Sequence, residues 1–376
     1  MKFIVSSTEL LSRLQLIGRV ISTKNTLPIL DHFLFQVSDK QLILSASDLE
    51  TTLITRLDLE NVSSTGSVAI PSRILLETLK EFSEQPLAFE VDQEAFSVVI
   101  NSQNGRYTIM GQNPSEFPSL PKIKEDKKNS LRINAKTLLS SISKTIFATA
   151  DDELRVVMNG IFVDVTKDEA TFVASDAHKL VRYKRSDVQT KSKASFILPK
   201  KPAGLLKNIL PREESDVLID FDDKNASFQL GSYRMVCRLT EGTYPSYNSV
   251  IPTNNPNKLI IDRVEFLNSL KRVSIYANQA SNLVKLQLTG NQMVVSAQDI
   301  DFSVSAYERL KCQYEGTEMD IGFKSSFLIE ILSNLSSTEV VLELSDPSRA
   351  ALILPVGKED ENEDVLMLLM PMTITA

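Results

Sequence analysis

One pattern occurs three times along this chain, and its first copy reads Leu42-Ile43-Leu44-Ser45-Ala46-Ser47-Asp48. The other copies read Thr171-Phe172-Val173-Ala174-Ser175-Asp176 and Met293-Val294-Val295-Ser296-Ala297-Gln298-Asp299. Each copy is an apolar run that ends in a polar turn, which is typical of a buried strand followed by a chain reversal. The copies lie much farther apart than the roughly 20–50 residues of a solenoid or propeller repeat, so they predict three domains of like shape.

The same order of elements surrounds each copy. A short strand leading into a helix precedes it, and a second strand-to-helix unit follows it. The predicted helices before the copies are Leu10–Ile21, Thr137–Ala148 and Val264–Ala277, and those after them are Arg73–Phe82, Gly204–Leu210 and Ser326–Leu335. Alternating apolar and polar residues between the helices predict half-buried strands. Each domain is therefore expected to be an α+β unit of two helices and antiparallel sheets.

Two proline-rich stretches separate the copies. They cover residues 113–121 and 244–256, and proline disfavours helix, so both predict extended connectors. The predicted domains are residues 1–122, 129–251 and 256–376. Within the last of these, Gly357–Asp364 is rich in acids and has no apolar residue to bury, which predicts a mobile, solvated loop.

The composition favours a protein of the cytosol. The 376 residues are 42% hydrophobic, enough for each third to bury a core. No stretch approaches the roughly 18 uncharged apolar residues of a membrane span, and residues near the N-terminus lack the apolar core of a signal peptide. The two cysteines, Cys237 and Cys312, fall in different thirds and form no CxxC motif. Isolated thiols suit a reducing compartment, so we expect a cytoplasmic protein without membrane contact.

Charge is distributed unevenly over the chain. The net charge is −7, which by itself argues against a nucleic-acid partner. The six helical segments 8–22, 71–83, 135–148, 199–210, 262–277 and 323–335, however, carry 13 Lys and Arg against 6 Asp and Glu. Basic helices on an acidic body are typical of a nucleic-acid footprint confined to one surface. In one of them, Lys136, Ser140 and Lys144 recur at helical spacing, away from the apolar Leu138 and Ile142.

Motifs of the common enzyme classes are absent. The sequence has no P-loop, GxGxxG, HExxH or GxSxG, and only two histidines, His32 and His178. The repeated Asp48, Asp176 and Asp299, with Asp301, could be imagined as a two-metal nuclease site. They lie in separate domains, and capping of a turn is the ordinary role of Asp after a strand. We predict a protein with no catalytic residues, metal ligands or cofactor.

Helix packing limits how such a protein could surround DNA. Six helices packed at about 8–10 Å close a circle only about 16–19 Å across, which leaves no opening once a thickness of about 10 Å is removed. Twelve helices, from two chains, leave roughly 20–30 Å. Groove depths give a duplex about 20 Å wide. Only two chains joined head to tail could therefore encircle it.

Short motifs along the whole chain resemble those of a known family. In order they are Met1-Lys2-Phe3, Thr26-Leu27-Pro28-Ile29-Leu30, Ser47-Asp48-Leu49-Glu50, Glu116-Phe117-Pro118-Ser119-Leu120, Met158-Asn159-Gly160, Ser175-Asp176-Ala177-His178-Lys179-Leu180, Tyr244-Pro245-Ser246-Tyr247 and Met370-Pro371-Met372. The ordered set resembles the bacterial DNA polymerase III β subunits, the sliding clamps. The resemblance implies a homodimeric ring around double-stranded DNA that tethers the DNA polymerase III catalytic subunit as a processivity factor. It also implies loading by an ATP-driven clamp loader.

The resemblance and the helix charges together give candidate DNA contacts. Lys24 occupies a loop position where the family usually has Arg, so the charge is kept but bidentate phosphate binding is lost. The helices supply the remaining candidates, which are Arg73, Lys136, Lys144, Lys200, Lys201, Lys207, Lys271 and Arg272. In a second loop, Asp151-Asp152-Glu153 is expected to weaken DNA contact or to confine it to Arg155.

The family also binds short linear peptides of polymerases and other proteins with a clamp-binding motif. The matching positions here are Arg155, Met158, Ser175, Ala177, His178, Lys179, Leu180, Pro245, Val250, Leu368, Leu369, Met370, Pro371 and Met372. Leu and Met around a few polar groups suit adaptable docking. Ser249 replaces a frequent Arg, and Thr373–Ala376 extend past the usual end, so peptide selectivity could differ.

The dimer contact implied by the family pairs edge strands of two subunits. Its positions here are Tyr107 and Ile109 in the first domain and Ile275 and Tyr276 in the third. Two other classes stay open from the residues alone. One is a metal-dependent nuclease that uses the repeated Asp turns, and the other is a repeat scaffold that does not touch nucleic acid.

Overall fold

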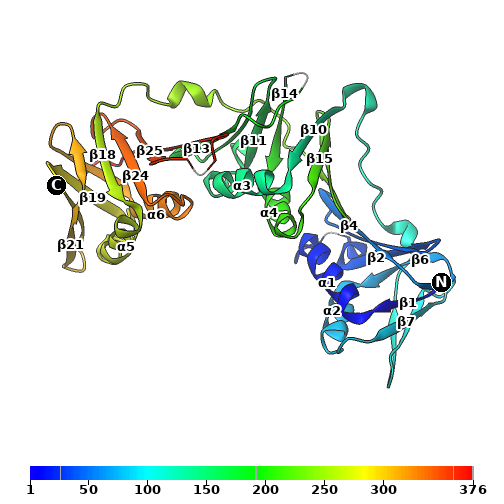
Figure 1. The fold of residues 1–376 in the computed structure, drawn as a ribbon. Coiled ribbons are helices and arrows are strands. Elements are labelled where there is room, and N and C mark those ends of the chain that lie inside the picture. Colours follow the sequence, from blue (N-terminus) through cyan, green and yellow to red (C-terminus); the bar gives the residue numbers. More distant parts are fainter. Residues whose placement is uncertain (26, 191–192, 359, 375–376) are drawn as a thin grey trace. The chain divides into compact units, whose positions relative to one another are not determined.

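The computed structural model describes residues 1–25, 27–190, 193–358 and 360–374. Thr26 of the second motif, Glu359 and the terminal Thr375 and Ala376 therefore lie outside the described residues. The chain divides into two compact units, Met1–Leu139 with Gly204–Leu239 and Ser140–Ala203 with Thr240–Ala376. Both units combine helices with antiparallel sheets (Figure 1).

The first unit contains two sheets and the helices α1 (Ser7–Ile17) and α2 (Ser72–Lys80). The smaller sheet has the order β5 (Asn61–Ser64), β1 (Lys2–Ser6), β7 (Pro86–Val91), β8 (Ser97–Asn101) and β9 (Arg106–Met110). The larger has the order β10 (Asn129–Asn134), β15 (Asp216–Phe221), β16 (Asn225–Leu230), β17 (Tyr233–Arg238), β4 (Thr51–Asp58), β3 (Gln41–Ser47), β2 (His32–Ser38) and β6 (Gly66–Pro71).

The second unit also has two sheets, with α5 (Arg263–Val273) and α6 (Ser325–Ser333) packed on each other (Figure 1). The nine-stranded sheet has the order β14 (Ala194–Pro199), β11 (Gly160–Val165), β12 (Ala170–Ser175), β13 (Lys179–Arg185), β26 (Glu363–Leu369), β25 (Ala351–Pro355), β24 (Glu339–Leu344), β18 (Asn257–Asp262) and β22 (Gln313–Glu315). The four-stranded sheet has the order β21 (Val304–Lys311), β20 (Gln292–Asp299), β19 (Leu283–Thr289) and β23 (Met319–Lys324).

The helices confirm the predicted segments with small shifts. The Ser6 hydroxyl accepts from the Glu9 amide at 3.1 Å to start α1, and Asp262 accepts from the Glu265 amide at 2.7 Å to start α5. Both pairs are capping residues of the expected types, because free amides of the first turn need acceptors. Short 3-10 turns extend α1, α3 (Ala135–Thr145) and α5 in the same way, over Gly18–Val20, Ile146–Ala148 and Ser274–Tyr276.

Helix α4 (Lys200–Ile209) begins four residues before its predicted start at Gly204. The earlier start agrees with the segment 199–210 that was used to count the helix charges, and it includes Pro202. Pro202 lies in the first turn, where an amide has no intrahelical acceptor, so proline is tolerated there. The correction brings Lys200 and Lys201 into the helix.

Both large sheets join strands of consecutive repeats. In the first unit, β4 pairs with β17, and in the second, β13 pairs with β26. The strands on either side of each pairing come from different copies of the repeat. Each junction is therefore a continuous hydrogen-bonded sheet with its own buried core. The boundaries at residues 1–122, 129–251 and 256–376 stay a prediction.

Candidate functional site

The repeated aspartates cap their turns. The Asp48 carboxylate accepts from the amides of Glu50 and Thr51 at 3.1 and 2.7 Å. Asp176 accepts in the same way at 2.9 and 2.8 Å, and Asp299 at 3.0 and 3.3 Å. The capping interpretation of these residues is confirmed. Among the described residues, no group of three or more His, Cys, Asp or Glu is arranged to hold a metal ion.

Basic side chains lie on the exposed faces of the helices. In α4, Lys200, Lys201 and Lys207 are exposed, whereas Leu206 and Ile209 are buried. In the described part of the chain, no carboxylate lies within 4.0 Å of the ammonium groups of Lys24, Lys136, Lys200, Lys207 and Lys271. These five cations are available to an external anion.

Two of the candidate arginines have carboxylate partners. Arg272 makes two hydrogen bonds of 2.6 Å to Glu308, and this contact lowers the pKa of the Glu308 carboxyl. Arg73 lies 3.0 Å from Glu77 one turn along α2. Their charge is partly compensated, so they attract phosphate less than the unpartnered lysines do. Arg155 is similarly held by Asp152 at 2.8 Å, which follows from the acidic loop noted in the sequence.

Lys144 is placed differently from the stripe that the helical spacing predicted. Its side chain is only 13% exposed, and its ammonium lies 3.2 Å from the Glu363 carboxylate, which is 6% exposed. The Tyr183 hydroxyl donates to the same carboxylate at 2.9 Å, and the ammonium lies 5.5 Å from the Tyr183 ring. Burial raises the pKa of the Tyr183 hydroxyl. Lys144 is therefore part of a buried network rather than an exposed cation.

The same network corrects the prediction for Gly357–Asp364. Glu363 and Asp364 belong to β26, and Asp360 accepts from Arg185, whose own side chain is 5% exposed. Sequence reasoning missed this because a run of acids is usually solvated. Buried partners on β13 and α3, far away in the sequence, supply the compensating charge.

An apolar cluster gathers many of the peptide-binding candidates. We call it the Tyr244 cluster, and it consists of Val173, Leu180, Ile197, Tyr244, Ala350, Leu352, Leu366 and Leu368, with Val157, Phe162, Tyr247, Ile251 and Leu354 packed against it. Tyr244 stacks on Phe162 at 4.9 Å between ring centroids. Leu180 and Leu368 meet because β13 and β26 pair at these positions.

The remaining peptide candidates lie at the surface of this cluster or inside the unit. Met158, Ser175, Lys179 and Leu369 are buried, while Arg155, Ala177, His178, Pro245, Val250 and Met370 are exposed, and Pro371 and Met372 are half-buried. Ala177 has φ 75°, a turn conformation matched by Leu49 at φ 78° in the first repeat. The Met370 amide donates to the His178 carbonyl at 2.8 Å, which joins two parts of the candidate set.

Lys179 is held from several sides. Its ammonium is bonded to Glu330 and lies 3.4 Å from Asp176 and 4.5 Å from the centre of the Phe327 ring. The His178 ring stacks on the same phenylalanine at 5.9 Å. Sequence reasoning missed Phe327 and Glu330. Both lie on the predicted helix Ser326–Leu335, three residues apart and therefore on one face, but the sequence alone does not show that Lys179 packs against that face.

A smaller cluster, the Phe117 cluster, lies in the first unit and consists of Ile29, Leu30, Leu34, Ala69 and Phe117.

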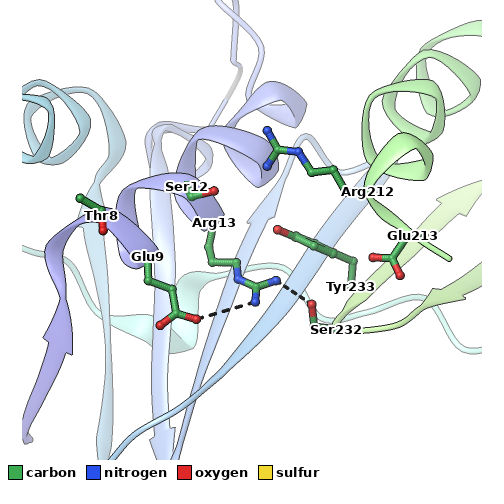
Figure 2. Close-up of a pocket in the computed structure, with 8 residues that line it drawn as sticks. All are labelled: Thr8, Glu9, Ser12, Arg13, Arg212, Glu213, Ser232 and Tyr233. Atoms are coloured by element: carbon green, nitrogen blue, oxygen red, sulfur yellow. Dashed lines mark hydrogen bonds and ion pairs between the residues drawn. The ribbon is translucent and has the colours of Figure 1, made fainter. Parts of the chain in front are cut away.

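In the same unit, Arg13 on α1 extends over the hairpin between β16 and β17 (Figure 2). Its guanidinium donates to the Ser232 hydroxyl at 2.6 Å and lies 5.2 Å from the Tyr233 ring centre. The surrounding cavity has a volume of about 540 Å³ and is also lined by Arg212 and Glu213. Burial raises the pKa of the Glu213 carboxyl, and the charge of Arg13 opposes that shift.

The dimer candidates lie at or near sheet edges. β9, with Tyr107 and Ile109, ends the five-stranded sheet, and β21 ends the four-stranded one. Tyr107 is 39% exposed and Ile109 is 6% exposed, whereas Ile275 and Tyr276 are 77% and 41% exposed. Large apolar side chains that the sequence reasoning missed are exposed beside β21, namely Ile300, Phe302, Val304 and Tyr307. Their exposure depends on the position of the strand, which periodicity alone does not give.

Models of one protein family match three consecutive parts of this chain. The N-terminal domain of the DNA polymerase III β subunit matches residues 1–121, the central domain 132–246 and the C-terminal domain 248–373. The chain belongs to the DNA polymerase III β subunit family. The predicted family and the α+β fold of three clamp domains are thereby confirmed.

Relatives in this β subunit family are similar over their whole length. The β sliding clamp of Pseudomonas putida is 28% identical over 378 residues, with 100% of both chains covered, and that of Staphylococcus aureus is 26% identical over 379 residues, with 99% of each covered. A solved sliding clamp from Bartonella birtlesii has a TM-score of 0.92 at 27% identity, and one from Pseudomonas aeruginosa has 0.92 at 25%. Each alignment covers 100% of both chains.

Membership of the β subunit family settles the class of protein. Sliding clamps are non-catalytic processivity subunits, so the nuclease alternative is set aside. The chain is a component of DNA replication, and the family implies association with DNA and a polymerase. Among the described residues, no helix is long and apolar enough to cross a membrane.

Proposed function

We propose that two copies of this chain close into a ring around duplex DNA and tether the replicative DNA polymerase III to its template. The observation that carries this proposal is the set of exposed lysines on the repeated helices of an acidic chain that have no carboxylate partner among the described residues. Lys136, Lys200, Lys207 and Lys271 belong to this set, with Lys24 in a loop. Lys201, Arg73 and Arg272 are further proposed contacts.

Weak phosphate contacts suit such a ring. A lysine attracts phosphate as a point charge without fixed geometry, so the contacts are sequence-independent and screened by salt. The ring itself keeps the protein on DNA, and weak contacts leave it free to slide. A polymerase bound to the ring remains at high effective concentration near the primer end.

The proposed dimer pairs β9 of one subunit with β21 of its partner. An unpaired strand edge satisfies its amides and carbonyls by pairing across subunits. Tyr107, Ile109, Ile275 and Tyr276 lie beside those edges, and the exposed Ile300, Phe302 and Tyr307 add apolar area. Light scattering should give twice the 41.9 kDa of one chain.

The proposed peptide site is the surface of the Tyr244 cluster. Its exposed apolar rim includes Val250 at 57% and Met370 at 40% exposure. Clusters of Leu and Met adapt to several ligands, which supports docking of the polymerase catalytic subunit, the ATP-driven clamp loader and other proteins with a clamp-binding motif. The remaining residues of the proposed site are Arg155, Met158, Ser175, Ala177, His178, Lys179, Leu180, Pro245, Leu368, Leu369, Pro371 and Met372.

Retention on DNA tests the ring. After loading by the clamp loader and ATP, the protein should stay on a nicked circular plasmid and be released when the plasmid is linearised. Equal retention on both forms would contradict a topological link. Replacing Lys200, Lys201 and Lys207 by Glu should reduce loading several-fold, because three cations become anions at the DNA. The matched control replaces Lys40, Lys167 and Lys193, which are exposed residues of turns and connectors, by Glu.

We also propose a cytoplasmic location, which a DNA-bound function requires. The two thiols support it, since Cys237 and Cys312 are free and buried. Burial raises the pKa of the Cys237 thiol, so it reacts poorly with oxidants.

A further inference from the structure

Three basic side chains surround the ring of Phe327 on α6. The Lys179 ammonium lies 4.5 Å from the ring centre, the Lys324 ammonium lies 4.8 Å from it, and the His178 ring stacks at 5.9 Å with an interplanar angle of 24°. Cations attract the negative face of an aromatic ring, which orders these groups around Phe327.

Lys179 and Lys324 differ in whether nearby carboxylates balance the charge of the ammonium group. Lys179 is bonded to Glu330 and lies 3.4 Å from Asp176, so two carboxylates meet one ammonium. Within the described residues, no carboxylate lies within 4.0 Å of the Lys324 ammonium, which has the ring of Phe327 beside it. Lys324 is half-buried, and water screens its charge less than that of a fully exposed lysine. Of the two ammonium groups beside Phe327, only that of Lys324 therefore lacks a carboxylate partner among the described residues.

Lys324 also borders the C-terminal segment of the proposed peptide site. It is the last residue of β23, and Gly322 of the same strand accepts from the Met372 amide at 2.8 Å. Met370 donates to the His178 carbonyl, and His178 stacks on the ring that Lys324 contacts. A peptide lying over Met370 and His178 would thus run past the Lys324 ammonium.

We propose that Lys324 makes the site prefer partner peptides that carry a carboxylate beside their apolar anchor residues. This inference rests on the proposed peptide-docking function. A carboxylate of Asp, Glu or a peptide C-terminus would supply the counter-charge that Lys324 lacks. A basic residue at the same place would meet two ammonium groups and be disfavoured. Lys324 is in this sense a specificity-determining residue, whereas the Tyr244 cluster supplies the apolar contact.

Selection from a random peptide library tests the preference directly. A phage library of nonamers is panned against the full-length protein, its K324E variant and a K80E control. Lys80 is an exposed lysine of α2 with no carboxylate within 4.0 Å among the described residues, so its replacement changes net charge equally. We expect Asp or Glu at one position beside the apolar residues for the wild type and K80E, and Lys or Arg at that position for K324E.

A binding measurement then gives the size of the effect. For one selected acidic peptide and its Asn or Gln counterpart, fluorescence polarisation measures Kd with the wild type, K324M and K80M. A partly exposed ion pair predicts that K324M weakens the acidic peptide about two- to five-fold, more so at low salt, and leaves the neutral peptide unchanged. K80M should change neither.

Each other outcome has a definite meaning. If K324M weakens both peptides equally, Lys324 only orients Phe327 and the charge preference is wrong. If selected peptides share apolar anchors but no acid, the docking function stands and this inference fails. If no peptide is enriched on the wild type, the proposed docking function itself fails, and the inference fails with it.

Discussion

The Phe117 and Tyr244 clusters occupy the same place in successive repeats. In the first, Leu34 pairs with Ala69 and packs near Phe117. In the second, Phe162 pairs with Ile197 and stacks on Tyr244. The aromatic residue precedes a proline in both, as Phe117-Pro118 and Tyr244-Pro245. In these features the two clusters have the same arrangement.

They differ where the neighbouring repeat joins the sheet. Beside Tyr244, Leu180 and Leu352 both lie opposite Leu368, so the apolar surface continues across β13, β26 and β25. The corresponding strands of the first unit place Thr52 and Ser227 opposite Val236. In the second unit, leucines at two paired strand positions make the junction between repeats suited to apolar ligands. In the first unit, hydroxyl side chains at the matching positions make the junction polar. We infer that very few residues distinguish the proposed peptide site from the matching junction of the first unit.

The helix-to-strand connections differ in a second way. In the second unit, Lys144 of α3 makes a buried ion pair with Glu363 of β26. In the first, Arg13 of α1 reaches Ser232 across an open cavity, and its side chain is 24% exposed (Figure 2). Tyr183 lies opposite Val365 as Thr55 lies opposite Tyr233. The buried Thr55 hydroxyl has no hydrogen-bond partner among the residues that the structure describes. A buried charge pair is sensitive to loss of one partner, whereas a solvated contact is tolerant of it.

Glu363→Ala should have the largest effect on stability of the variants that compare the two connections. It removes the buried carboxylate that the Lys144 ammonium and the Tyr183 hydroxyl share. Loss of one member of a buried pair costs about 3–5 kcal/mol of unfolding free energy. Urea denaturation followed by circular dichroism measures it.

The double variant Lys144→Met, Glu363→Gln is the control for that result. It removes the charges together and keeps an acceptor for Tyr183, so it should recover most of the lost free energy. A double variant as unstable as Glu363→Ala would mean that lost packing, and not the loss of the shared carboxylate, lowers the unfolding free energy.

Leu180→Thr gives the Tyr244 cluster the residue found at the matching position of the first unit, Thr52. It removes buried methyl groups and buries a hydroxyl, which should cost about 2–3 kcal/mol. Peptide binding should weaken as well, because Leu180 contributes to the proposed apolar surface. Thr52→Val is the control, and it should leave peptide affinity unchanged. Equal peptide affinity of Leu180→Thr and wild type would remove Leu180 from the site.

Much of this fold follows from local sequence patterns. The repeated sequence pattern predicted the segments of α1 to α6, and the position of Asp48, Asp176 and Asp299 after strands predicted their capping role, because both depend on residues close in the chain. The burial of Lys144 and Glu363 could not be predicted. Each looks solvated in its own segment, and they meet only in the folded chain because they lie 219 residues apart in the sequence.

The candidate site shows the same division. Leu180, His178 and Met370 were found through motifs, while Phe327 and Lys324 were not. No local pattern separates the half-buried Lys324 of a strand end from any other lysine. Its significance depends on the ring beside it and on the lack of a nearby carboxylate, which are properties of the folded chain.

Arg13→Ala tests whether the first unit tolerates loss of its connection. The Arg13 contact with Ser232 is partly solvated, so its removal should cost only about 1 kcal/mol of unfolding free energy. Arg212→Ala is the matched control, because Arg212 lines the same cavity without a hydrogen bond or ion pair among the described residues. Thermal denaturation of both variants measures the difference. A loss of several kcal/mol for Arg13→Ala would contradict the contrast between the two connections.

Glu213→Gln should produce the smallest change in unfolding free energy. The pH dependence of that change shows whether the carboxylate stabilises or destabilises the folded state. Burial raises the pKa of the Glu213 carboxyl in the folded state above that in the unfolded chain. The folded state then holds the proton more tightly, so its favourable contribution is complete below the unfolded pKa of about 4.3 and is lost as pH rises through the folded pKa. Glutamine does not titrate, so the variant loses no stability in this way as pH rises. Glu213→Gln should match wild type near pH 4 and be more stable at pH 7, by less than about 1 kcal/mol because solvent reaches the cavity. A Glu213→Gln variant less stable at pH 7 would mean that Arg13 stabilises the carboxylate more than burial disfavours it.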